Sequence, residues 1–184
     1  MTLIQLKSFH KYAIFLFMVT FLIILLIIML VSLVAVFIGV GIYNEKCNEK
    51  KKAAIREQIT KLANNELEIT PDEFFDIRKA SFGRRGRPSY TLTKNFAGVY
   101  ILHNKTKNMY YVGQGKEVLN RVNSHFTGKG NGDVYADYKY GDVFTIRMIG
   151  LAESGYATLN DLERDTILTY DAFAKGYNKT RGNR

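Results

Sequence analysis

The apolar positions divide the chain into one long continuous run and a mixed remainder. No residue from Tyr12 to Asn44 is charged, and positions 13–43 are almost wholly apolar. A helix needs about 20 such residues to cross the hydrocarbon core of a bilayer, whereas the apolar core of a signal peptide has only about 7–15. The pattern therefore predicts an uncleaved transmembrane helix within residues 1–44, in contact with membrane lipids through residues 12–44.

A charged helical pattern follows the apolar run. Over residues 45–65 the apolar side chains recur at i, i+4 and i+7 and make one narrow stripe, formed by Ile55, Ile59 and Leu62. We expect a helical stalk whose stripe packs on itself, on a second copy or on the domain that follows.

A second helix is predicted over residues 70–80. Thr70 supplies the N-cap, Pro71 suits the first helical position, and Glu73 completes a capping box. The glycine and proline content of residues 83–95 is typical of a loop.

The pattern changes to strand-like alternation at Ala97. In residues 97–103, Val99 and Ile101 occupy one face and Tyr100 and Leu102 the other. A polar turn separates this strand from a second at 109–113. A third strand is predicted at 143–151, with one face formed by Phe144, Ile146 and Met148.

Two further helices and a loop complete the pattern. The helix predicted at 116–126 has a core stripe of Leu119, Val122 and Phe126. The helix predicted at 158–173 begins at the N-cap Thr158 and turns four residues to the core: Leu159, Leu162, Thr166 and Ile167. Between the two helices, Gly128, Gly130 and Gly132 predict a flexible loop.

These elements predict an α+β fold with a small three-stranded, largely antiparallel sheet flanked by helices. The expected organisation is a transmembrane segment at 1–44, a helical stalk and basic linker at 45–96, and a catalytic or binding domain at 97–184.

The distribution of basic residues and the cysteine content predict on which side of the membrane the C-terminal domain lies. Two basic residues, Lys7 and Lys11, precede the apolar run, and more follow it closely: Lys46, Lys50, Lys51, Lys52 and Arg56. Because basic residues flank the cytoplasmic side of a span, we expect a single-pass membrane protein with its C-terminal domain in the cytoplasm. Cys47 has no second cysteine to pair with, which fits a reducing compartment. The scattered histidines and single cysteine make no zinc site.

A basic stretch without acidic residues suggests a polyanionic partner. Residues 77–116 contain nine Lys and Arg and no Asp or Glu, so this region attracts phosphodiester chains or anionic lipid headgroups. Arg84, Arg85, Arg87 and Lys116 are the candidate nucleic-acid contacts. Within residues 77–116, the motif 85-RGRP-88 resembles the core of an AT-hook, which binds the minor groove of AT-rich DNA. The alternatives for this motif are a loop that contacts phosphate or lipid and a simple linker.

Six residues in a fixed order carry the candidate chemistry. GVY at 98–100 and YVG at 111–113 are followed by Arg121 and His125 on the next helix, by Glu163 in 159-LNDLE-163, and by Asn178 in 176-GYN-178. This ordered pattern resembles the GIY-YIG nuclease superfamily over about residues 97–182. No core position of the pattern is missing, so we expect an active site.

The residue types suit phosphodiester hydrolysis, which needs an activated water, stabilised phosphoryl charge and help for the leaving oxygen. The fork-shaped cation of Arg121 suits a phosphate, and its spacing from His125 predicts that the two act together from one helix face. Glycine at Gly98 and Gly113 permits close backbone approach.

The resemblance assigns further roles. It implies that Tyr100 is the general base, that Tyr111 positions the phosphate or a metal-bound water, and that Asn178 fixes local geometry. It also implies that Glu163 holds one Mg²⁺ or Mn²⁺ ion. A free phenol has a pKa of about 10, so the role of Tyr100 requires a lowered pKa, for which a nearby arginine and a hydrogen bond to His125 are the available causes.

Three functions compete at this point. The first is a membrane-anchored, metal-dependent endonuclease acting on DNA, with RNA not excluded. The second is a non-catalytic membrane anchor that binds nucleic acid through the basic surface. The third places the basic clusters on anionic lipid and leaves the domain to bind protein.

Gln114 departs from the family pattern, which often has a small hydroxyl residue or lysine there. Tyr110 is expected to serve packing, and His103 is expected to be structural or exposed.

Overall fold

A computed structural model describes residues 3–81 and 95–183, with side chains described at 15–78 and 95–183. The chain divides into two compact units, Met1–Lys51 and Lys52–Arg184. Because residues 82–94 are not described, the predicted loop at 83–95 lies almost wholly outside the described residues, together with Arg84, Arg85 and Arg87.

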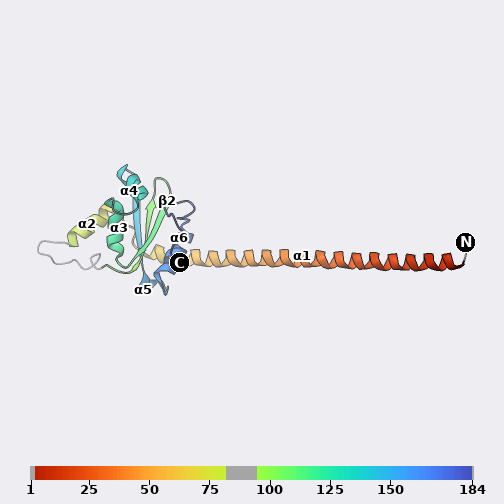
Figure 1. The fold of residues 1–184 in the computed structure, drawn as a ribbon. Helices are drawn as coiled ribbons and strands as arrows, with labels where there is room; N and C mark the ends of the chain where they lie inside the picture. The colour runs from red at the N-terminus through yellow and green to blue at the C-terminus, as the bar shows by residue number, and fades with distance from the viewer. Residues whose placement is uncertain (1–2, 82–94, 184) are drawn as a thin grey trace. The chain divides into compact units, whose positions relative to one another are not determined.

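The first unit is part of a continuous helix, α1 (Leu3–Asn65), drawn from red to yellow in Figure 1. Its large apolar side chains from Phe15 to Tyr43 are exposed. Two polar side chains within the apolar run are satisfied locally, because the hydroxyl groups of Thr20 and Ser32 donate to carbonyls three residues earlier. Among the described residues, α1 is the one helix long and apolar enough to cross a membrane.

The second unit is built on a three-stranded antiparallel sheet, as predicted. Its strands are β1 (Gly98–Asn104), β2 (Met109–Gly115) and β3 (Phe144–Gly150), in the order β2-β1-β3. The register places Tyr100 opposite Gly113 and Leu102 opposite Tyr111. Partners in an antiparallel pair share a sheet face, so both motif tyrosines lie on the same face.

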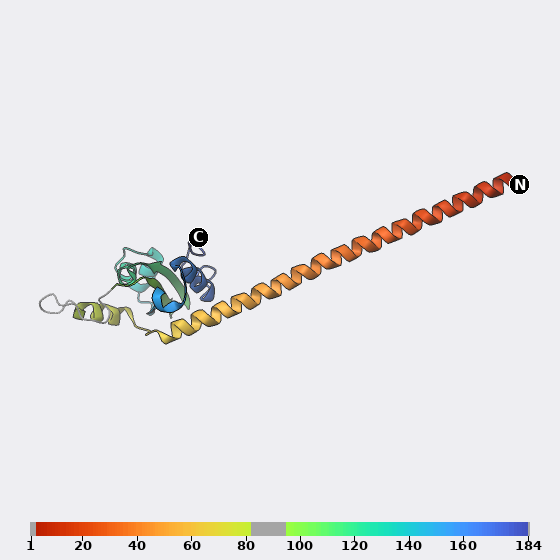
Figure 2. The same cartoon turned by 90° about the horizontal axis from the view of Figure 1, so that it is seen from below.

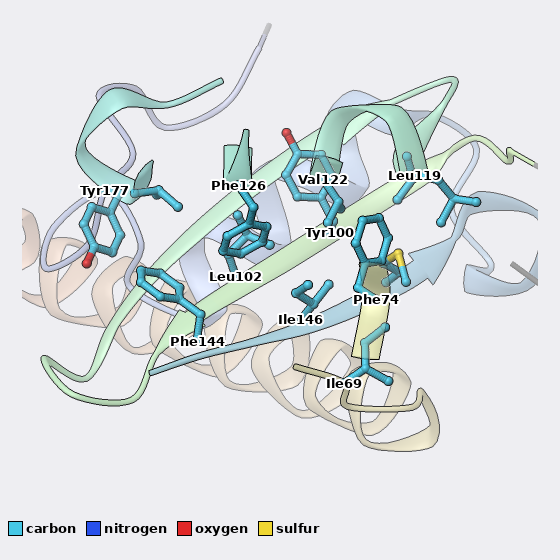
Figure 3. Close-up of a cluster of buried hydrophobic side chains, with 13 residues drawn as sticks. Ile69, Phe74, Tyr100, Leu102, Leu119, Val122, Phe126, Phe144, Ile146 and Tyr177 are labelled. Carbon is cyan, nitrogen blue, oxygen red and sulfur yellow. The ribbon is translucent and has the colours of Figure 1, made fainter. Parts of the chain in front are cut away.

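Helices cover both faces of the sheet (Figure 1, Figure 2). One face packs against α2 (Pro71–Ser81), α3 (Val118–Phe126) and α4 (Gly132–Lys139). The other packs against the end of α1, α5 (Leu151–Ser154) and α6 (Leu159–Thr169). The two cores follow the predicted alternation, with Tyr100 and Leu102 in the first core (Figure 3) and Val99 and Ile101 in the second.

The last turns of α1 belong to the second core. Ile59 and Ala63 are fully buried, and Ile55 and Leu62 pack against the same cluster at partial burial. Arg147 of β3 ties this end of the helix to the sheet by donating to Asn64 at 3.0 Å and to Glu68 at 2.7 Å. The predicted stripe is therefore covered by the domain itself.

The predicted helix starts are confirmed in detail. At α2, the Thr70 hydroxyl accepts from the Glu73 N–H at 3.2 Å, and the Glu73 carboxylate accepts from the Thr70 N–H at 2.7 Å. At α6, the Thr158 hydroxyl accepts from the Asp161 N–H at 3.1 Å.

Other boundaries differ from the prediction. The glycine-rich stretch is not a flexible loop throughout, because Gly132 opens α4 and the Asn131 side chain caps that helix by accepting from Asp133 and Val134. The short helix α5 was not predicted. Helix α6 ends at Thr169, four residues earlier than expected, and residues after it turn through Asp171, which has a positive φ.

Candidate active site

Three aromatic rings from three elements meet on the first face of the sheet. Tyr100 of β1 is fully buried, and its hydroxyl lies 2.9 Å from Nε2 of His125 on α3. The Tyr111 ring of β2 lies 6.2 Å from the Tyr100 ring and 4.7 Å from the His125 ring, between centroids. Figure 3 shows the Tyr100 ring among apolar side chains, with its hydroxyl at the edge of the cluster. The fold thus brings together three of the six predicted residues in one aromatic group.

Gly113 is required by the position of Tyr100. The Tyr100 ring crosses the neighbouring strand at its register partner, and a Cβ on Gly113 would lie 2.5 Å from the Tyr100 Cζ and overlap the hydroxyl. Gly98 has a different reason, because a Cβ there would collide with the carbonyl of Ile149 on β3. We predicted close backbone approach at both glycines; the groups that approach are a tyrosine side chain and a neighbouring strand.

The loop before α4 fixes the protonation of His125. The Asn131 N–H donates to Nδ1 of His125 at 2.9 Å. Burial, with a contribution from the nearby charge of Arg121, lowers the pKa of His125 to about 4, so the ring is neutral at pH 7. A neutral imidazole has one donor and one acceptor nitrogen. Because Nδ1 accepts, the proton lies on Nε2, and His125 donates to the Tyr100 oxygen.

The pKa of Tyr100 moves opposite to the expected direction. Burial is the largest cause and raises it above the ordinary value of 10; Tyr111 raises it further, while the charge of Arg121 lowers it. Both features that we named as causes of a lowered pKa are present, but burial outweighs them. Tyr100 is therefore a protonated phenol at neutral pH in this structure.

Arg121 and His125 lie four apart on α3 but differ in exposure. Arg121 is exposed and His125 is buried, although residues four apart lie on one helix face. Arg121 is nevertheless close enough for its charge to lower the pKa of both tyrosines and of the histidine. It supplies the positive charge of the site.

Glu163 lies on α6, where its side chain is nearly buried, with 8% of its surface exposed. Its Oε2 accepts from Gln114 Nε2 at 2.9 Å and from the Asn183 N–H at 3.4 Å. The carboxylate also raises the pKa of Tyr111, which places its charge near the aromatic group. The site therefore spans both sides of the edge strand β2.

The donor set near Glu163 restricts what it could hold. Among the side chains that the structure describes, at 15–78 and 95–183, those of His, Cys, Asp and Glu form no group of three or more suited to a metal. Mg²⁺ commonly keeps several waters and binds through one or two carboxylates together with substrate phosphates. A single oriented carboxylate fits such an ion and does not fit a structural cage.

Asn178 acts on the backbone of β2. Its Oδ1 accepts from the Val112 N–H at 2.9 Å, and its Nδ2 donates to the Val112 carbonyl at 2.7 Å. The side chain thus replaces a neighbouring strand at the edge of the sheet, directly between Tyr111 and Gly113.

The remaining predicted residues lie apart from this group. Lys116 is exposed after β2. Tyr110 stacks on His103 with 4.1 Å between ring centroids, on the face opposite Tyr100, as expected for a packing role of Tyr110.

Sequence reasoning missed three residues at the site. Gln114 contacts Glu163, the Asn131 backbone contacts His125, and Gly130 leaves room for the imidazole, since a Cβ there would lie 2.6 Å from Nδ1. The departure of Gln114 from the family pattern is the one signal of this contact in the sequence. The other two depend on loop conformation.

A comparison with known protein families finds a match in the C-terminal part of the chain. Residues 96–178 match the family described as the GIY-YIG catalytic domain, a range that includes all six predicted site residues. No curated protein and no solved structure matches the chain.

Proposed function

Since residues 96–178 carry a GIY-YIG catalytic domain, we propose that the protein is a membrane-anchored endonuclease that hydrolyses phosphodiester bonds of DNA with one divalent metal ion. The observation that carries this proposal is the buried hydrogen bond between Tyr100 and the neutral, donating His125, beside the exposed cation of Arg121.

Tyr100 is the base in the proposed reaction. Its hydroxyl oxygen accepts a hydrogen bond from His125, so the hydroxyl proton points elsewhere and can leave without breaking that bond. The N–H of His125 and the charge of Arg121 stabilise the phenolate that results. Burial opposes ionisation, so the ionised fraction is small at neutral pH and rises with pH.

The other residues orient the substrate and the strand. Arg121 binds the phosphoryl oxygens, and Tyr111 positions the scissile phosphate. Asn178 is a positioning residue that holds β2 in place through Val112. Glu163 would hold the Mg²⁺ or Mn²⁺ ion, which supplies positive charge to the phosphate and the leaving oxygen.

The membrane anchor and the substrate are also proposals. The apolar run of α1 supports a span, and the basic residues after it support a cytoplasmic C-terminal domain. The exposed Lys116 and the basic stretch around it support nucleic acid as the partner, with RNA as a second substrate.

A non-catalytic anchor that binds nucleic acid is the second candidate. The raised pKa of Tyr100 favours it, because a phenol that stays protonated is a poor base. It shares the basic surface with the first candidate and differs in having no hydrolysis.

Cutting of supercoiled plasmid by the full-length protein in detergent separates these functions. We expect nicked or linear product with Mg²⁺ or Mn²⁺, none with a chelator, and none from Glu163→Gln. Glu153→Gln, which changes an exposed glutamate on α5, should cut as the wild type does. Equal cutting by Glu163→Gln would refute the metal site, and binding without cutting by the wild type would favour the anchor.

A further inference from the structure

Gln114 joins the edge strand to the helix that carries Glu163. It lies one residue after the second motif and pairs with Val99 in the register, so its side chain is on the sheet face that α6 covers. Its Nε2 donates to Glu163 Oε2 at 2.9 Å and to Asn160 Oδ1 at 2.7 Å. One amide nitrogen therefore bridges two residues of α6.

Elementary chemistry fixes the orientation of this amide. A carboxylate oxygen in this contact accepts the hydrogen bond, so Gln114 presents its NH₂ group to Glu163. That group has two hydrogens, and the second reaches the Asn160 oxygen. Asn160 and Glu163 are three apart on α6, and residues at this spacing lie on one helix face. Asn160 thus holds the amide in the position from which it contacts the carboxylate.

We propose that Gln114 is a positioning residue for the metal-binding carboxylate, and that it sets the affinity of the protein for its divalent ion. The inference rests on the proposed function of Glu163 as the ligand. A free glutamate samples several rotamers, and ordering a flexible side chain costs conformational entropy. A donor on Oε2 holds the carboxylate in one orientation before the ion arrives.

The contacts argue against a purely structural role. Two hydrogen bonds with the Asn178 side chain hold the backbone of Val112, two residues earlier on the same strand. The contact of Gln114 ends instead on the one carboxylate proposed as the metal ligand. Hydrogen-bond partners of metal ligands commonly change metal affinity or activity about 10-fold to 100-fold when removed.

The test is direct Mn²⁺ binding to the full-length protein in detergent, followed by the electron paramagnetic resonance signal of free Mn²⁺. Gln114→Met keeps the length of the side chain and removes both donors. We expect its Mn²⁺ affinity to fall by about 10-fold or more, and Glu163→Gln to lose binding. Gln58→Met, at an exposed position of α1, should bind as the wild type does.

Two further readouts separate positioning from structure. Thermal melting of Gln114→Met should match the wild type, and plasmid cutting should need more Mg²⁺ for half-maximal rate while the rate at saturating Mg²⁺ stays within a few fold. If Gln114→Met does not fold, Gln114→Ala replaces it, and failure of both to fold would show that the residue is structural and overturn the inference.

Two patterns of Mn²⁺ binding separate the role of Gln114 from that of Glu163. Wild-type affinity in both Gln114 variants, with binding lost in Glu163→Gln, would overturn the role of Gln114 alone. Equal binding by the wild type and Glu163→Gln, or no binding by either, would overturn the metal site and the inference with it.

Discussion

At the scale of single residues, the site depends on a phenol held between an imidazole and a glycine. Tyr100 reaches across β2 at Gly113, and its oxygen meets the donating nitrogen of His125. The neutral histidine is fixed by a backbone N–H of Asn131. Each of these contacts leaves little freedom for the hydroxyl, so small changes around it should affect chemistry more than folding.

Gly113→Ala tests this arrangement. The added methyl group would overlap the Tyr100 ring and hydroxyl, which displaces the oxygen from His125. A displacement of about 1 Å can cost about 100-fold in rate, so we expect plasmid cutting to fall by about that factor. The matched control is Gly132→Ala, where a Cβ meets nothing within 4 Å; equal cutting by the two variants would contradict the prediction.

The buried neutral His125 predicts a pH dependence of stability. Its pKa falls from 6.5 in the unfolded chain to about 4 in the fold, so between these values the unfolded chain binds a proton that the fold does not. Unfolding free energy should therefore drop as pH decreases from 6.5 to 4, by roughly 3 kcal/mol from this residue.

The measurement is the thermal midpoint of the full chain in detergent across this range, compared with His125→Gln. The variant should show a shallower decline because it lacks the titrating group. Parallel curves for the two proteins would contradict the assignment of a buried neutral histidine.

Tyr100, Tyr111 and His125, which were named by their order in the sequence, meet in one aromatic group, but their contacts needed the structure. Alternation alone predicted that Tyr100 faces one core while Val99 faces the other. The tautomer of His125 could not be predicted from the sequence, because it depends on the backbone N–H of Asn131, six residues away, whose direction is set by the loop. The raised pKa of Tyr100 likewise results from complete burial, which sequence spacing does not measure.

At the scale of elements, the end of α1 completes the domain. Ile59 and Ala63 cover the sheet face formed by Val99, Ile101 and Val112. The end of α1 is thus part of the core, which includes residues upstream of the family match at 96–178.

Ile59→Ala measures this contribution. Removing a fully buried isoleucine side chain to its Cβ costs about 2–5 kcal/mol, so urea unfolding of the full chain in detergent should show a loss of that size by near-ultraviolet circular dichroism. Lys61→Ala, at an exposed position two residues away, should change stability little. A loss at Ile59 no greater than at Lys61 would show that the helix end does not support the domain.

Elements with strong periodicity or caps were predictable, and short ones were not. Thr70 and Thr158 marked helix starts correctly because their capping contacts are local. Helix α4 was missed because its start at Gly132 continues a glycine-rich stretch, and Asn131 rather than an apolar stripe defines it. Helix α5 has four residues, too few for a period to appear.

At the scale of the whole molecule, an apolar helix and a basic domain that matches the GIY-YIG family share one chain. The proposed topology puts the C-terminal domain in the cytoplasm, and the single Cys47 allows a direct check. In intact cells a membrane-impermeant maleimide should leave Cys47 unlabelled and should label it after lysis.

Because Cys47 is partly buried and close to the apolar run, a second site is needed. Lys129→Cys in a Cys47→Ser background places the thiol at an exposed position of the domain and should give the same pattern. Labelling of either thiol in intact cells would reverse the proposed orientation.

The most direct test of a role for Tyr100 in hydrolysis is the rate at which Tyr100→Phe cuts plasmid in a single turnover with Mg²⁺. The substitution removes one oxygen and keeps the buried ring. Loss of a general base costs about 100-fold to 10,000-fold, so we predict a loss in that range, while Tyr110→Phe on the opposite sheet face keeps the wild-type rate. Cutting by Tyr100→Phe within twofold of the wild type would show that this hydroxyl takes no part in hydrolysis.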